Sequence, residues 1–63
     1  MKIYVVEGVL DNQVQIGFAL SKSVAESEAK KINDYGGIGY AGNKVYVTEY
    51  ECTPDSYTEF DAY

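Results

Sequence analysis

This 63-residue chain contains no histidine, no arginine and no tryptophan, and its five basic residues are all lysine. Without imidazole or guanidinium groups, it lacks the most common general base at neutral pH and the usual bidentate clamp for carboxylates and phosphates. Its one cysteine, Cys52, excludes an intrachain disulfide, and a metal site built on His and Cys ligands has no support. We therefore expect a protein that is not an enzyme and that uses no cofactor.

Long hydrophobic runs are also absent. The chain has no stretch of about 18 apolar residues and no charged start followed by an apolar segment, so we expect neither a membrane span nor a signal peptide. The lone thiol is typical of the reducing cytoplasm. A single domain of this size buries only about 60% of its unfolded surface. Because no disulfide or metal stabilises it, we expect a homodimer.

The net charge of −5 argues against direct binding of nucleic acid or of an anionic membrane, both of which attract clustered Lys and Arg. The acidic residues concentrate in residues 49–63, which contain no lysine and several aromatic side chains. Such a segment favours a partner protein with a basic surface. We divide the chain into a core domain, residues 1–52, and an acidic aromatic tail, residues 53–63.

Three segments have the composition of strands. Residues 2–8 and 44–50 share Lys, Tyr, Val and Glu at the same offsets and are rich in β-branched and aromatic residues. Residues 13–20 alternate apolar and polar or small positions, with Val14, Ile16, Phe18 and Leu20 expected on one face. The Asp11-Asn12 turn between the first two segments predicts an antiparallel hairpin.

Residues 21–33 have the pattern of a helix with small apolar residues on one face. Ser21 is the expected N-cap, and Ser23 with Glu26 offers a competing capping box two residues later. The sequence thus predicts an α+β fold of ββαβ type, a three-stranded sheet of order 2-1-3 with one helix on one face. By alternation, the helix should cover a face formed by Ile3, Val5, Val45 and Val47. The other face, with Tyr4, Tyr46 and Tyr50, is then open, covered by the tail or covered by a partner.

Other motifs have weaker chemical implications. Gly37, Gly39 and Gly42 match the dinucleotide-binding spacing, but they follow a helix, lead into a strand and enclose no basic residue, so we expect a flexible loop carrying Tyr35 and Tyr40. Glu49 and Glu51 could form an acid–base pair, but nothing builds a cleft around them. The tail acids do not have the spacing of a calcium loop.

The segments at residues 2–7, 18–26 and 45–51 resemble short bacteriophage-encoded proteins of strand-strand-helix-strand layout, most of which have no assigned function. The resemblance covers residues 1–51 and contains no site motif. It implies a phage or prophage origin, and small acidic phage proteins often block host enzymes or defence systems.

We therefore expect a non-enzymatic binding protein that inhibits a host protein with a basic surface in the cytoplasm. Seven tyrosines are a high number for this length, and tyrosine is favoured at interfaces, although several could instead fill a small core. The alternatives are an acidic mimic of DNA and a small-ligand or nucleotide-binding module. The candidate contact residues are Tyr4, Tyr46, Tyr50, Asp55, Tyr57, Glu59, Phe60 and Asp61.

Overall fold

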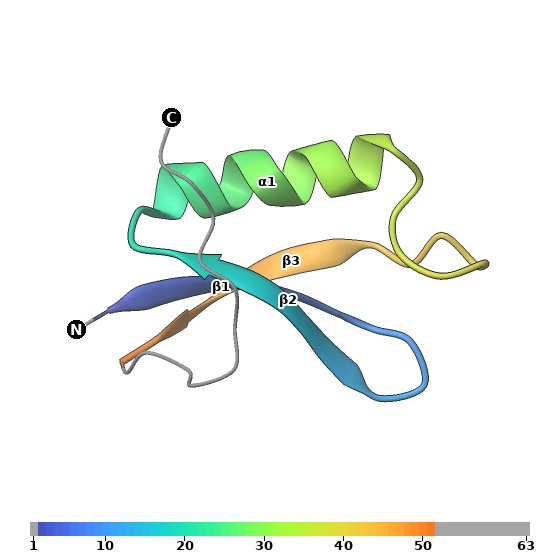
Figure 1. The fold of residues 1–63 in the computed structure, drawn as a ribbon, viewed down its shortest axis with the longest axis horizontal. Helices are drawn as coiled ribbons and strands as arrows, with labels where there is room; N and C mark the ends of the chain where they lie inside the picture. Colours follow the sequence, from blue (N-terminus) through green and yellow to red (C-terminus); the bar gives the residue numbers. More distant parts are fainter. Residues whose placement is uncertain (1, 52–63) are drawn as a thin grey trace.

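The computed structural model describes residues 2–51 and shows a three-stranded antiparallel sheet with one helix (Figure 1). The strands are β1 (Ile3–Val9), β2 (Gln13–Ala19) and β3 (Val45–Tyr50), and the helix is α1 (Lys22–Asp34). The sheet order is β2-β1-β3, which confirms the predicted fold class. No helix within residues 2–51 is long and apolar enough to cross a membrane. The predicted tail, residues 53–63, lies outside the described residues.

The β1–β2 hairpin contains a bulge that changes which face each β2 side chain occupies. Val6 pairs with Gly17 but Glu7 pairs with Gln15, so Ile16 is an extra residue in β2. Because one extra residue shifts the two-residue alternation, Ile16 packs on the helix side whereas Phe18 belongs to the cluster on the opposite side. The prediction that Ile16 and Phe18 share a face was therefore wrong.

The register between β1 and β3 sets the two faces of the sheet. Ile3 pairs with Tyr50 and Val5 with Thr48, and directly paired residues lie on the same face. Ile3 and Val5 therefore face away from α1, and the residues that face α1 are Tyr4, Val6, Val45 and Val47. The prediction that Val45 and Val47 face the helix was right, and the prediction that Ile3 and Val5 do so was wrong. The error arose because the similarity of the two segments does not determine how they pair.

Small residues let α1 approach the sheet closely. Ser21 is the N-cap, as predicted, although its side chain makes no capping hydrogen bond. Ala25 and Ala29 are buried against Val6 and its neighbours in the helix-side core. The helix ends at Asp34, and the backbone N–H of Gly37 donates to the Ile32 carbonyl at 2.9 Å. Gly37 has a φ of +77°, a conformation that residues with a side chain rarely adopt.

The side-chain amide of Asn33 joins the end of α1 to the start of β3. Its Oδ1 accepts a hydrogen bond from the Val45 backbone N–H at 2.8 Å, and its Nδ2 donates to the Val45 carbonyl at 3.0 Å. The amide thus satisfies both backbone groups of Val45, as a neighbouring strand would. The backbone N–H and C=O groups of successive residues in a strand point to opposite sides of the strand. Because β3 is an edge strand and both groups of Val45 bind Asn33, the amide covers the outer edge of β3 at its first residue.

We predict that Asn33→Ala lowers the free energy of unfolding by about 1–2 kcal/mol, because it leaves a backbone donor and acceptor of Val45 without protein partners. Glu26→Ala, on the exposed side of the same helix, should change it by less than about 0.5 kcal/mol. Urea denaturation followed by far-UV circular dichroism measures both. Equal effects of the two substitutions would show that the Asn33 amide does not hold β3.

Candidate functional site

Three of the eight predicted contact residues fall within the described residues. Tyr4 is partly buried and packs on the helix-side core, so its predicted place on the face away from α1 was wrong. Tyr46 and Tyr50 do lie on that face, which we call the far face, and Tyr46 remains half exposed. The others lie outside the described residues: Asp55, Tyr57, Glu59, Phe60 and Asp61.

Tyr50 forms part of a buried polar cluster on the far face. Glu7, in the middle of the central strand, has no exposed surface. The Tyr50 hydroxyl lies 3.0 Å from Glu7 Oε1 and 2.8 Å from Oε2, and the side-chain amide of Gln13 donates to Oε1. The hydroxyl of Tyr50 is therefore engaged within the fold. Sequence reasoning missed this cluster, although an acidic residue in an otherwise apolar strand was a signal that it needed donors.

The two most exposed large apolar side chains of the described residues are those of Tyr35 and Tyr40, at one end of the molecule, whereas Leu20, 53% exposed, lies in the connection between β2 and α1. Tyr35 is 94% exposed and Tyr40 is fully exposed, both in the loop between α1 and β3. Figure 1 shows this loop and the β1–β2 turn at the same end, away from the N-terminus. We use the name loop-end patch for the exposed apolar side chains of this loop and of the neighbouring end of the β1–β2 hairpin, which are Val9, Leu10, Val14, Tyr35 and Tyr40.

Hydrogen bonds order the loop that carries Tyr40. The backbone N–H of Ile38 donates to the Asn43 carbonyl at 2.8 Å, and the N–H of Asn43 donates back to the Ile38 carbonyl at 2.9 Å. The Ile38 side chain packs on the helix-side core, and Asn43 Nδ2 donates to the Val9 carbonyl at 2.6 Å. Within the loop that we expected to be flexible, the structure shows a small hairpin with Tyr40 at its tip, joined to the end of β1 by the hydrogen bond from Asn43 to Val9.

The same geometry weighs against phosphate binding by the glycines of this loop. They follow the C-terminal end of α1, where the helix dipole is negative. The space where a side chain on Gly37 would lie is bordered by the carbonyl oxygens of Gly42 and Asn43, which repel anions. Within residues 2–51, no three His, Cys, Asp or Glu side chains gather as a metal ion would require.

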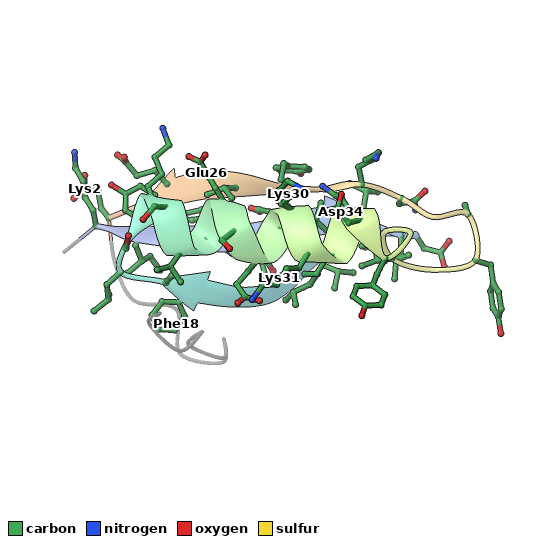
Figure 2. The ribbon with its side chains drawn as sticks, turned by 90° about the horizontal axis from the view of Figure 1, so that it is seen from above. Lys2, Phe18, Glu26, Lys30, Lys31 and Asp34 are labelled. Atoms are coloured by element: carbon green, nitrogen blue, oxygen red, sulfur yellow. The ribbon has the colours of Figure 1, made fainter. Side chains whose placement is uncertain are left out.

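Lysines already pair with most of the described acidic side chains. Figure 2 shows Glu26, Lys30, Lys31 and Asp34 along α1. The Lys30 ammonium lies 2.7 Å from Asp34 Oδ2, and this hydrogen bond and the charge of Asp34 raise the pKa of Lys30. The other ion pairs are Lys2–Glu49, Lys22–Glu26 and Lys31–Glu28, with N–O distances from 3.4 to 3.9 Å.

Comparison with known proteins gives no relative. No protein-family model, no curated protein and no solved structure matches this chain. The resemblance to phage proteins therefore stays a prediction.

We predict that Tyr50→Phe lowers the free energy of unfolding by about 1–3 kcal/mol, because it removes a donor from the buried Glu7 carboxyl group. Tyr46→Phe, on the same strand and face but half exposed, should change it by less than about 0.5 kcal/mol. Adding Glu7→Leu to Tyr50→Phe should restore part of the loss, since the acceptor is then gone as well. Urea denaturation of the unaltered chain, the two single variants and the double variant measures these free energies. If Tyr50→Phe leaves the free energy of unfolding unchanged, the hydrogen bond to Glu7 does not stabilise the fold.

Proposed function

We propose that this chain is a small non-enzymatic protein-binding module that contacts its partner through the loop-end patch. The observation that carries this proposal is the full exposure of Tyr40, together with the exposure of Tyr35, on ordered backbone. Neither side chain belongs to the two hydrophobic clusters of the fold. Their exposed apolar surface therefore has no role in stabilising the described domain.

The anchored hairpin supports a binding role on energetic grounds. Tyrosine offers a large and rather rigid contact area with a polar tip, and it is enriched among residues that dominate interface affinity. Because the hairpin and the Asn43 contact already fix the backbone, little conformational entropy is lost when a partner binds. The exposed side chain of Leu10 lies against Gly39, the residue before Tyr40, and adds apolar surface next to the Tyr40 contact.

The charge of the chain supports a basic partner. The net charge is −5, and Asp11, exposed in the β1–β2 turn, lies beside the loop-end patch. Opposite net charges increase the rate of association more than they strengthen the final complex. We place the module in the cytoplasm, because its only cysteine, Cys52, suits a reducing compartment. Inhibition of a host protein is one form of this proposal and depends on the phage resemblance.

The described residues give less support to the two alternatives. A mimic of DNA needs a row of unpaired carboxylates, whereas four acidic residues lie within 4.0 Å of a lysine ammonium: Glu26, Glu28, Asp34 and Glu49. A nucleotide-binding loop needs backbone N–H groups and positive charge around the phosphates. The glycine loop instead follows the negative end of α1.

A photo-crosslinking amino acid at position 40 tests the proposed contact. In cells of the organism that encodes the chain, Tyr40→p-benzoylphenylalanine should give one discrete adduct after illumination, because Tyr40 would lie at the centre of the interface. The matched control places the same group at Glu26, on the exposed side of α1. Adding Leu10→Ser to the position-40 variant should reduce the adduct at least about tenfold, the effect of losing one apolar contact at an interface centre.

Mass spectrometry of the adduct identifies the partner. An adduct with twice the mass of the chain would show that the partner at this contact is a second copy of the chain and not a different protein. Equal crosslinking from positions 40 and 26 would contradict a specific contact at the loop-end patch.

A further inference from the structure

Two charged side chains at the loop end have no partner in the part of the chain that the structure describes. Lys44 is exposed, and no carboxylate oxygen of residues 2–51 lies within 4.0 Å of its ammonium group. Asp11 is also exposed, and its carboxylate makes no hydrogen bond or ion pair within the same residues. The other four lysines are all paired with acidic side chains: Lys2, Lys22, Lys30 and Lys31.

Asp11 adjoins the contact between the β1–β2 turn and the hairpin that carries Tyr40. Leu10, the residue before Asp11, fills the space in which a side chain on Gly39 would lie. The backbone N–H of Leu10 donates to the Asn12 carbonyl at 3.1 Å, so a hydrogen bond also fixes the turn around Asp11. Because Gly39 directly precedes Tyr40, a partner that covers Tyr40 and Leu10 also approaches Asp11.

Lys44 adjoins a second contact between the same two connections. Asn43, the residue before Lys44, donates from its Nδ2 to the Val9 carbonyl at 2.6 Å. The backbone of Asn43 also pairs with Ile38 across the hairpin. Val45, the residue after Lys44, is buried and begins β3. Lys44 is thus attached to a fixed backbone at the base of this hairpin.

An interface over the loop-end patch therefore sets a requirement on the charges of the partner. A partner surface that covers Tyr40 removes water from nearby side chains, and a charge that loses water without gaining an opposite charge weakens binding. Like charges brought together across an interface weaken binding further. Because neither Asp11 nor Lys44 has a counter-charge within residues 2–51, the partner has to supply both.

We propose, on the basis of the proposed protein contact at the loop-end patch, that the partner presents a lysine or arginine to Asp11 and a carboxylate to Lys44. Two opposite charges on fixed backbone, beside an apolar contact, determine the orientation of the partner as well as its sign.

This pairing restricts the class of partner further than net charge does. The net charge of −5 attracts basic proteins from a distance. A uniformly basic surface, such as a nucleic-acid-binding cleft, would nevertheless place positive charge against Lys44 and be repelled there. The partner surface is therefore of mixed sign at the contact, with an acidic group among basic ones.

Charge reversals in the position-40 crosslinking chain test this proposal. In cells of the organism that encodes the chain, the probe is Tyr40→p-benzoylphenylalanine, combined in turn with Asp11→Lys and with Lys44→Glu. Each reversal should reduce the adduct at least about tenfold, because each places like charges together at the contact. The matched controls on α1, Glu26→Lys and Lys22→Glu, change the net charge by the same amounts and should leave the adduct nearly unchanged.

The response to Lys44→Glu separates this pairing from attraction by net charge. A uniformly basic partner surface would bind Lys44→Glu more tightly, and a larger adduct would overturn the proposal. Equal losses from Asp11→Lys and Glu26→Lys would overturn it as well, since the position of the charge would then not matter. An adduct that both loop-end reversals leave unchanged would contradict the charge pairing and keep the loop-end contact. No adduct from position 40 in the otherwise unaltered chain would contradict the contact itself, and the pairing with it.

Neutral substitutions keep the test valid if a charge reversal prevents folding. Asp11→Asn and Lys44→Gln nearly preserve the size of each side chain and remove its charge. Both should reduce the adduct severalfold, because the counter-charge of the partner then faces a neutral group. Far-UV circular dichroism should stay that of the unaltered chain. Unchanged adducts from both neutral variants would overturn the proposal.

Discussion

The burial of the central strand on both faces is the constraint on which the rest of this structure depends. Ile3, Val5 and Val6 are all fully buried although they alternate between the two sides of β1. A strand with apolar side chains on both faces needs a layer above and a layer below. The helix α1 supplies one layer through its small residues Ala25 and Ala29. The same constraint explains why Glu7, in the middle of this strand, is surrounded by donors and not by water.

The edges of the sheet are protected by two different devices. On β2 the extra residue at Ile16 disrupts the regular ladder, and such bulges discourage pairing with another chain. On β3 the amide of Asn33 occupies both outward backbone groups of Val45. These features make lateral addition of a strand at these positions unfavourable. The proposed partner contact uses neither edge but the loop-end patch, where Tyr40 is fully exposed.

The sequence was sufficient to predict the fold class, the strand order and the helix with its N-cap, because these follow from strand composition, turn residues and helical periodicity. The faces of β1 could not be predicted, since a strand that is apolar on both sides carries no alternation. The bulge at Ile16 has no residue signature in this segment, so the position of Phe18 was missed. The bond between Tyr50 and Glu7 joins residues 43 positions apart, and no local pattern indicates it.

The most direct test of a central strand buried on both faces is the solvent accessibility of its methyl groups. A soluble gadolinium chelate, which cannot enter the fold, increases the relaxation rates of exposed methyl protons. We predict small increases for Ile3, Val5 and Val6 alike, and large increases for Val9 and Val14, which lie exposed at the loop end. Increases for Ile3 and Val5 as large as those for Val9, with Val6 still protected, would show that only the helix side is covered and would contradict this account.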